Sequence, residues 1–320
     1  MAVVYQPQKV RLDALRRAVA EAEQEFGWEP SRWYETRVDS AGRAHALQAI
    51  EEGADVVAAA GGDGTVREVA EGMRGTGIPM AIIPSGTGNL LARNLELPIQ
   101  SDEAAVRIAM TGTARAIDLG MIAVRRPGAP PDERPDEHAF TIIAGIGLDA
   151  NMIRNTRPEL KRRIGWMAYF HGMARAVSEA RPIRILYSID GAPRRAASVY
   201  TAMIANCGML PGRIQLMPEA SLDDGVLDIA AVRPRGWFGW VRVWRTVVIE
   251  NGVLRRSPFL RRIADLRSRT VEDVIYRRGR DVQLSVVHPQ PVQCDGDDLG
   301  EAIAVHAWVE PHALLVKLPS

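Results

Sequence analysis

Three glycines and one aspartate stand at a predicted strand-to-helix corner, in the run Gly61-Gly62-Asp63-Gly64-Thr65. Residues 54–60 before it are short and apolar, as in a buried strand, and the apolar residues of 66–73 recur at helical spacing. Free N–H groups at the start of a helix bind phosphate, and glycine lets a ligand approach closely. An aspartate in the same turn suits a magnesium ion that accompanies phosphates. A glycine-rich turn without a ligand remains the alternative.

A second glycine-rich corner, Pro84-Ser85-Gly86-Thr87-Gly88-Asn89, follows the apolar stretch 78–83 and precedes a helix predicted from Leu90. Neither corner continues as Gly-Lys-Ser/Thr, and neither has the Gly-x-Gly-x-x-Gly spacing, so the Walker A and dinucleotide motifs are excluded. The side chains that could bind phosphate or nucleobase here, or else cap helices, are Thr65, Thr87 and Asn89. Ligands of parallel sheets sit beyond the carboxyl ends of the strands, so we expect both corners to face one site.

Two acidic turns stand out in the second half of the chain. The run Gln293–Asp298 lies between strand-like segments, where a carboxylate could accept the proton of a hydroxyl nucleophile. The run Pro218–Val226 combines acids with turn carbonyl groups, which are ligands for a hard cation. In both runs an ordinary hairpin turn is the alternative, since Asp-Gly is a common hairpin signal.

The elements that must position these residues alternate between strand and helix in the first part of the chain. Residues 3–5 form a predicted strand, residues 12–26 an amphipathic helix, and residues 41–51 a second helix that leads to the strand before Gly61. Such alternation predicts a parallel sheet with helices on both faces. We therefore expect an N-terminal Rossmann-like, doubly wound α/β domain over residues 1–119.

The pattern changes near residues 115–120, and residues 125–138 have the composition of a solvated loop. Helices are predicted at 162–179 and 237–254. The remaining segments are strand-like: 139–144, 183–189, 197–205, 226–232, 282–287, 302–307 and 312–318. Many strands and few helices predict a mainly antiparallel β-sandwich domain over residues 120–320, whose last segment could return to the first domain.

Composition limits the classes of binding partner and the cellular compartment that we expect for this protein. The chain has 320 residues and a net charge of +1, so no global field points to nucleic acid. No apolar run approaches the roughly 20 residues of a membrane span, and residues 1–7 do not resemble a signal peptide. The only cysteines, Cys207 and Cys294, are far apart, and no His-x-x-x-His occurs. These features predict a reduced cytoplasmic protein without a zinc site.

Taken together, Gly61–Thr65, Glu68 and Pro84–Asn89 resemble the nucleotide-binding motifs of the diacylglycerol kinase catalytic-domain family. This family includes bacterial soluble lipid kinases and the sphingosine and ceramide kinases. The resemblance continues in the same order over nearly the whole chain, through Ile117–Gly120, Gly145–Ala150, Asn206, Pro218–Val226 and Asp295–Asp297. NAD kinases share a version of Gly-Gly-Asp-Gly-Thr, so the full series is more specific than that motif alone.

The resemblance implies transfer of the γ-phosphoryl of ATP to a lipid hydroxyl, with magnesium. The ATP-binding residues that it implies are Thr36, Gly61, Gly62, Asp63, Gly64, Thr65, Glu68, Ser85, Gly86, Thr87 and Asn89. Asp297 falls at the position of the general base, with Asp63 and Asp295 as further catalytic candidates. A structural magnesium ion is implied at Ser221, Asp224 and the carbonyl of Val226, and Asp118, at the domain junction, is expected to help order the site.

Two departures from the family pattern leave part of this site open. The family base is usually glutamate, and Asp297 is one methylene shorter, while catalytic reach is sensitive to about 1 Å. Asp298 and Asp295 could substitute for it. The opening stretch Val3–Lys9 keeps the proline of the family but neither its asparagine nor its glycine, so the resemblance does not extend to ATP contacts from that loop.

The acceptor is expected to be diacylglycerol or a related lipid, reached by transient contact with a membrane surface, and a homodimer is left open. Aromatic and basic residues over 235–245, and the basic stretches 161–163 and 255–262, could lie at a lipid interface. Packing of the tryptophans inside the protein, with solvated arginines, is the alternative. The other functions that the sequence leaves open are a NAD kinase-like or other alcohol kinase, and a catalytically weak lipid- or nucleotide-binding regulator.

Overall fold

The structure is a computed structural model that describes residues 1–36, 42–130, 132–147, 181–210, 214–217, 219–234, 239 and 273–320. The helices predicted at 162–179 and 237–254 lie outside the described residues, apart from residue 239. The same holds for the basic and aromatic stretches proposed at the lipid interface, for Gly145–Ala150 beyond residue 147, and for Pro218.

A parallel sheet forms the first part of the chain, with the strand order β4-β3-β1-β2. Its strands are β1 (Ala2–Tyr5), β2 (Arg32–Glu35), β3 (Val57–Gly61) and β4 (Met80–Pro84). Every residue of β1, β3 and β4 is buried, as expected for parallel strands covered on both faces.

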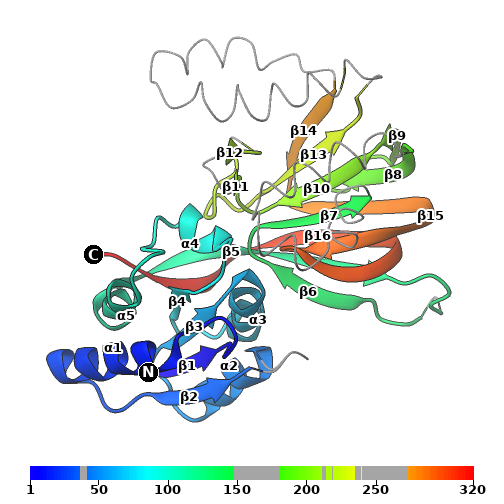
Figure 1. Ribbon diagram of the computed structural model, residues 1–320. Helices are drawn as coiled ribbons and strands as arrows, with labels where there is room; N and C mark the ends of the chain where they lie inside the picture. The colour runs from blue at the N-terminus through cyan, green and yellow to red at the C-terminus, as the bar shows by residue number, and fades with distance from the viewer. Residues whose placement is uncertain are drawn as a thin grey trace, which may run out of the picture.

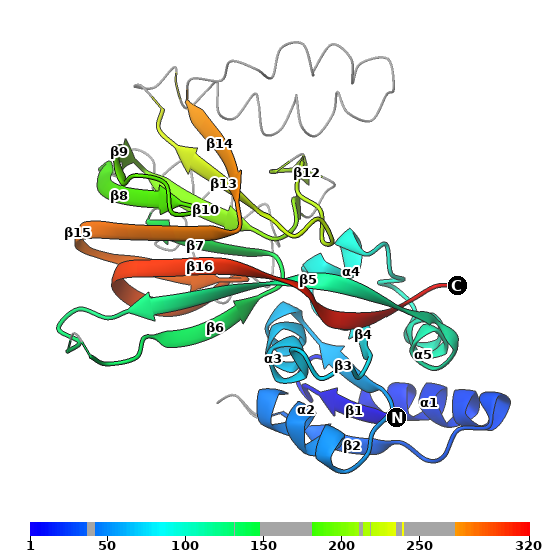
Figure 2. The ribbon, with the colours of Figure 1, turned by 180° about the vertical axis from the view of Figure 1, so that it is seen from behind.

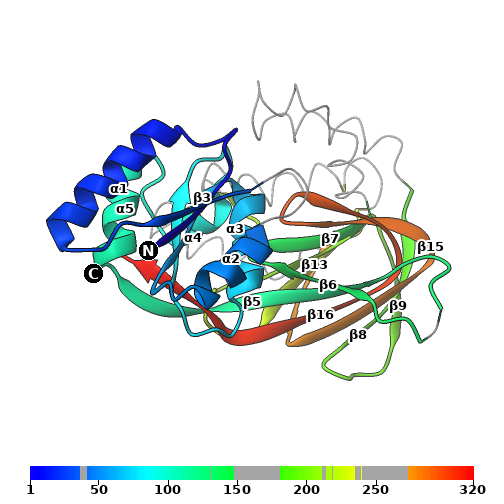
Figure 3. The ribbon, with the colours of Figure 1, turned by 90° about the horizontal axis from the view of Figure 1, so that it is seen from below.

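Helices cover both faces of this sheet (Figures 1 and 3). Alternate residues of β1, β3 and β4 pack on α1 (Leu12–Phe26) and α5 (Asp102–Thr111) on one side. The intervening residues pack on α2 (Gly42–Glu51), α3 (Asp63–Met73) and the short α4 (Leu90–Asn94) on the other side. The predicted α/β domain is therefore confirmed.

The second part of the chain is antiparallel. Its longer strands follow the order β14-β13-β10-β7-β15-β16, with β5 and β6 beyond β16, and β8 and β9 beside β15. These strands are β5 (Thr113–Arg125), β6 (Asp136–Phe140), β7 (Ile143–Gly147), β8 (Ile183–Ile189), β9 (Arg195–Val199), β10 (Thr201–Ala205), β13 (Leu227–Val232), β14 (Val274–Gly279), β15 (Asp281–Cys294) and β16 (Asp297–Leu318); β11 (Met209–Leu210) and β12 (Ile214–Gln215) form a separate small pair. Their side chains form a large apolar core, and a second, smaller cluster lies on the other face of β10 and β13; the predicted β-sandwich is confirmed.

Several strand limits differ from the prediction. The segment predicted as one strand at 139–144 is divided between β6 and β7, because the backbone N–H groups of 141–143 bind a carboxylate instead of a neighbouring strand. Residues 197–205 likewise form two strands, β9 and β10. Most of the predicted solvated loop at 125–138 is a loop in the structure, but β6 already begins at Asp136.

Two long strands connect the two parts. β5 and β16 pair along most of their length and extend from the sandwich to the α/β domain (Figure 2). At its far end β16 also pairs in parallel with β4, with Val316 opposite Met80. The predicted domain boundary at residue 119 falls inside β5. The last segment of the chain therefore lies beside the first sheet, and β5 and β16 join that sheet directly to the sandwich.

Candidate active site

The two glycine-rich corners touch each other at the carboxyl ends of β3 and β4. β3 ends at Gly61, α3 begins at Asp63, and Gly62 between them is extended, with φ −91° and ψ −172°. The Ser85 N–H donates to the Gly61 carbonyl at 2.8 Å. The backbones are so close that a Cβ on Gly86 would lie 2.6 Å from the Gly62 Cα. The predicted meeting of the two corners is thus present in the structure.

Asp63 joins these corners. Its carboxylate accepts the backbone N–H groups of Asn89 at 3.0 Å and Leu90 at 2.5 Å, at the start of α4. Burial raises the pKa of Asp63, while the two N–H groups act against that rise. The aspartate suspected of binding magnesium therefore caps α4 and fixes the second corner relative to the first.

The second corner holds its own shape by internal hydrogen bonds. Asn89 has a left-handed backbone, with φ 48°. Its side-chain amide donates to the Gly86 carbonyl at 2.8 Å and its oxygen accepts the Gly86 N–H at 2.9 Å. The Arg93 Nε donates to the Gly88 carbonyl at 2.7 Å. Asn89 is thus a shaping residue, while Thr87 is exposed at the tip of the corner.

The remaining predicted ATP residues lie around this edge, and Glu68, Thr36 and Ser85 use their polar groups in hydrogen bonds within the protein. The Glu68 carboxylate accepts the Gly42 N–H at 3.1 Å at the start of α2, and burial raises its pKa. The buried Thr36 follows β2, and its N–H and hydroxyl both donate to the Tyr5 carbonyl, at 2.8 and 3.2 Å. Ser85 donates its hydroxyl to the carbonyl of Ile83 at 3.3 Å. The Thr65 hydroxyl oxygen packs against Gly61, where an added Cβ would lie only 2.5 Å from it.

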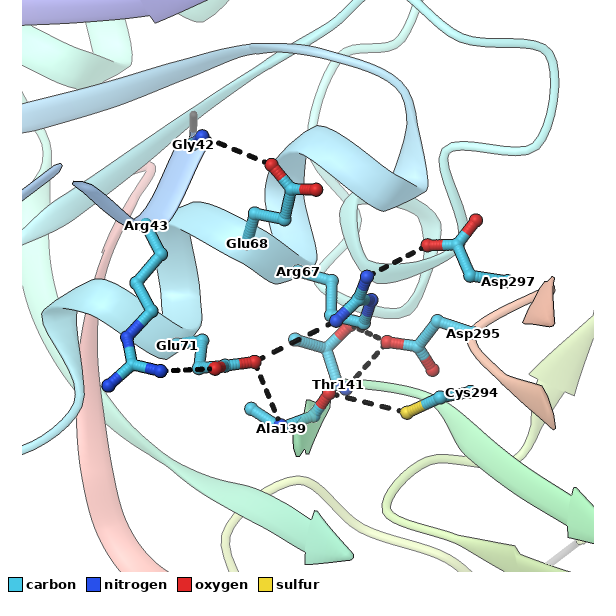
Figure 4. A network of polar contacts seen from close by, with 10 residues as sticks. All are labelled: Gly42, Arg43, Arg67, Glu68, Glu71, Ala139, Thr141, Cys294, Asp295 and Asp297. Atoms are coloured by element: carbon cyan, nitrogen blue, oxygen red, sulfur yellow. Dashed lines mark hydrogen bonds and ion pairs between the residues drawn. The ribbon is translucent and has the colours of Figure 1, made fainter. Parts of the chain in front are cut away.

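Asp297 brings a carboxylate from the sandwich to the first corner. It begins β16, and its side chain is 48% exposed. A Cβ on Gly64 would lie 3.3 Å from the Asp297 Oδ2, so the carboxylate stands over the first turn of α3. The same oxygen is 2.9 Å from the Arg67 Nη2 (Figure 4). The predicted base and the predicted phosphate corner are therefore neighbours, although their residues are far apart in the sequence.

Asp295 has a different task from Asp297. It is buried, and its carboxylate accepts four hydrogen bonds: from the Thr141 N–H at 2.7 Å, the Thr141 hydroxyl at 2.9 Å, the Ile142 N–H at 2.9 Å and the Ile143 N–H at 2.8 Å. Burial raises its pKa, against the effect of these donors. Asp295 therefore holds the turn between β6 and β7. The exposed Asp298 accepts the N–H of Gly300 at 2.8 Å, so Asp297 is the acid of this turn that faces α3.

Two charged residues of α3, Arg67 and Glu71, lie at the site but were not predicted from the sequence. Arg67 is buried, and Glu71, one turn later, lies with its Oε2 3.7 Å from the Arg67 Nη1. Glu71 also accepts the Arg43 Nη1 at 3.0 Å and the Ala139 N–H of β6 at 3.1 Å. The i,i+4 spacing of opposite charges beside the glycine corner was the available signal. The partners on β6 and β16 leave no local pattern in the sequence.

The turn expected to hold a structural magnesium ion is engaged by other groups. Ser221 donates to Asp223 at 2.7 Å, and Asp224 contacts Arg278 and accepts the Val226 N–H at 3.3 Å. Among the described residues, no group of three or more His, Cys, Asp and Glu side chains is arranged to hold a metal ion. In this arrangement Arg278 contacts one oxygen of the Asp224 carboxylate, so magnesium and Arg278 would compete for that oxygen. The magnesium site at Ser221, Asp224 and Val226 stays a prediction.

Asp118 orders the junction beside that turn. Its carboxylate is fully buried and accepts the N–H groups of Gly225 at 2.6 Å and His312 at 2.9 Å. His312 lies in the irregular stretch of β16 and has a left-handed backbone, with φ 55°. Asp118 thus ties β5 to both the acidic turn and β16.

A cavity of about 300 Å³ lies between α4 and residues 207–209, 217 and 220–223. Polar side chains at its wall include Asn94, Arg115 and Asp223, and the buried Cys207 also lines it. Asn94 exchanges two hydrogen bonds with the backbone of Met209 across the domain junction, at 3.0 and 3.1 Å. Asp297 is not among the residues that line this cavity.

The fold and the site define a two-domain protein in which the glycine corners of an α/β domain meet a carboxylate from a β-sandwich. Residues 5–122 match the family described as the diacylglycerol kinase catalytic domain. Residues 142–318 match the family described as the YegS C-terminal NAD kinase beta sandwich-like domain. The chain therefore belongs to the family of diacylglycerol kinases and YegS-like lipid kinases, and the resemblance drawn from its motifs is confirmed.

Individual relatives agree with this assignment. A protein named diacylglycerol kinase from Mycobacterium tuberculosis is 31% identical over 199 residues, which are 62% of this chain and 62% of that protein. A probable lipid kinase YegS-like protein from Pseudomonas aeruginosa is 32% identical over 277 residues, 85% of this chain and 80% of that protein. The crystal structure of a putative diacylglycerol kinase from Bacillus anthracis shares the fold, with a TM-score of 0.72 at 18% identity, over 99% of this chain and 96% of that one.

Among the helices that the structure describes, none is long and apolar enough to cross a bilayer.

Proposed function

We propose that this protein is an ATP-dependent lipid kinase that transfers the γ-phosphoryl group of ATP to the hydroxyl of diacylglycerol or a related lipid. The observation that carries the proposal is the place of Asp297, over the first turn of the helix that follows the Gly61–Thr65 corner. A phosphate bound at that corner and a hydroxyl bound at Asp297 would be neighbours. Family membership supports the same chemistry.

The proposed roles follow from the geometry of the corners. The N-terminal end of α3 presents free N–H groups and a partial positive charge, which suit the phosphates of ATP. Gly62 and Gly86 leave the backbone bare where the corners meet, and the exposed Thr87 is available to the nucleotide. Magnesium that accompanies ATP would neutralise part of the phosphate charge.

Asp297 would accept the proton of the lipid hydroxyl as that oxygen attacks the γ-phosphorus. Its side chain is half exposed, so an acceptor can reach it. Asp63 and Asp295 support this arrangement through the hydrogen bonds that fix the second corner and the 141–143 turn. Access to a lipid acceptor would require transient contact with a membrane surface, and we propose such a peripheral location.

The test is ADP release from the purified protein with ATP, magnesium and mixed micelles that contain diacylglycerol, a sphingoid base or phosphatidylglycerol. We expect turnover with one of these lipids and a loss of about 10²–10⁴-fold in kcat for Asp297→Asn. The matched control is Asp298→Asn, which changes the next acid of the same turn and should retain kcat within about threefold.

Other outcomes point elsewhere. Turnover that survives Asp297→Asn would move the base to another residue. Turnover with NAD or another soluble alcohol, and none with lipid, would establish the other kinase class. ATP binding without turnover on any acceptor would establish a nucleotide-binding regulator.

A further inference from the structure

We propose that Arg67 is a positioning residue that holds the carboxylate of Asp297 over the phosphate corner. The inference rests on the proposed function for its catalytic consequence, but the placement itself is independent of the acceptor. The Asp297 Oδ2 accepts a hydrogen bond from the Arg67 Nη2 at 2.9 Å, and the same oxygen lies above Gly64. A half-exposed carboxylate has several rotamers available, and this ion pair selects the one that faces α3.

Arg67 is itself held from the other side. Its second nitrogen, Nη1, faces Glu71 at 3.7 Å, one helical turn away on the same face of α3. Glu71 is anchored by Arg43 of α2 at 3.0 Å and by the Ala139 N–H of β6 at 3.1 Å (Figure 4). A continuous chain of polar contacts thus connects strand β6 of the sandwich, through Glu71 and Arg67, to Asp297 at the start of β16.

Stability alone does not explain an arginine at this position. The side chain of Arg67 is only 10% exposed, and its Nε has no hydrogen-bond partner in the part of the chain that the structure describes. A buried donor without a partner costs about 1–3 kcal/mol, and a buried ion pair often stabilises no more than apolar residues of similar volume. A planar fork that reaches two carboxylates at once is what arginine offers and lysine lacks.

The catalytic consequence follows from distance. A base must lie within hydrogen-bond reach of the acceptor hydroxyl, and a misplacement of about 1 Å can lower a rate about 10²-fold. Without Arg67, the Asp297 carboxylate loses the cation that keeps it above Gly64. Glu71 would keep Arg43 and the Ala139 N–H, so the contact between α3 and β6 should survive the loss of Arg67.

The test compares Arg67→Met with Arg43→Met, which removes a cation from the outer end of the same network without touching Asp297. We expect Arg67→Met to lower kcat for lipid phosphorylation about 10–100-fold, with the KM for ATP within about threefold of wild type, and Arg43→Met to leave both nearly unchanged. Arg67→Lys should retain an intermediate kcat. Combined with Asp297→Asn, Arg67→Met should cost little more, because the two residues act as one unit.

Equal losses in Arg67→Met and Arg43→Met, or additive losses in the double variant, would overturn the inference. Crystal structures of wild type and Arg67→Met, or of Arg67→Lys if the methionine variant does not fold, provide a readout that needs no acceptor. We expect the Asp297 carboxylate to turn away from Gly64 in the variant, and an unmoved carboxylate would contradict the proposal. If wild type phosphorylates no lipid, the proposed function fails, while these structures still decide the role of Arg67.

Discussion

Gly86 is the position in the site where we expect an added methyl group, as in Gly86→Ala, to be most disruptive. A Cβ there would lie 2.6 Å from the Gly62 Cα and 2.9 Å from the Asn89 Oδ1, whereas carbon atoms in contact normally stay about 3.5–4.0 Å apart. Gly86→Ala must therefore push the two corners apart by about 1 Å. A Cβ on Gly62 would instead lie 3.6 Å from the Gly86 Cα, which is an ordinary van der Waals contact. The two glycines touch each other, yet only one of them should resist substitution.

The expected costs can be worked from these contacts. Overpacking costs about 1–3 kcal/mol, and disturbing the two hydrogen bonds between Gly86 and Asn89 adds about 1 kcal/mol. We therefore expect Gly86→Ala to lower the free energy of unfolding by about 2–4 kcal/mol. Gly62→Ala changes the residue that precedes the first turn of α3, where alanine is a poorer cap than glycine, and should cost about 1 kcal/mol at most.

Urea denaturation without nucleotide measures both costs, so this prediction does not depend on the reaction. In the activity assay, Gly86→Ala should lower kcat/KM for ATP about 100-fold, since the corners move by about 1 Å. Equal destabilisation by the two alanines, or a larger loss for Gly62→Ala, would refute the close approach of the corners on which the site is built.

Three further substitutions test how the carboxylates and the sandwich are held. Asp295→Asn should lower the free energy of unfolding by about 2 kcal/mol or more in urea, because an amide group would face donors such as the Thr141 N–H; a neutral effect would contradict its structural role. Burial raises the pKa of Asp228 to about 6, above its ordinary 3.8, so the folded protein favours the protonated carboxyl group. The resulting contribution to the free energy of unfolding is complete below pH 4 and is lost as the pH rises through 6. Asp228→Asn should therefore gain up to about 3 kcal/mol relative to wild type between pH 4 and pH 7.5, whereas parallel pH profiles would refute the shift. Gly120→Ala would place a methyl group in the ring of Phe140 and should lower the thermal midpoint by several degrees, which an unchanged melting curve would disprove.

The local part of this fold could be predicted from the sequence. Apolar runs that end in glycine corners define β3 and β4, and helical spacing defines α1 and α3, because each signal is contained in a few consecutive residues. The division between β6 and β7 could not be predicted in this way. It depends on Asp295, which reaches that turn from more than 150 residues away.

The site was predictable in its position but not in the role of each acid. An aspartate in a glycine-rich turn serves equally well as a metal ligand, a base or a cap for nearby N–H groups. Asp63 and Asp295 turn out to bind backbone N–H groups, while Asp297 remains half exposed over α3. The ion pair between Arg67 and Asp297 could not be predicted, because it forms only where the fold brings β16 against α3.

The most direct test of the central proposal is transfer of labelled phosphate. Wild-type protein and Asp297→Asn would be incubated with ATP labelled in the γ-phosphoryl group, magnesium and mixed lipid micelles, and the organic and aqueous fractions separated. The account predicts label in one lipid product with wild type and a loss of about 10²-fold or more with the variant. Label confined to a water-soluble acceptor, or equal lipid labelling by both proteins, would contradict it.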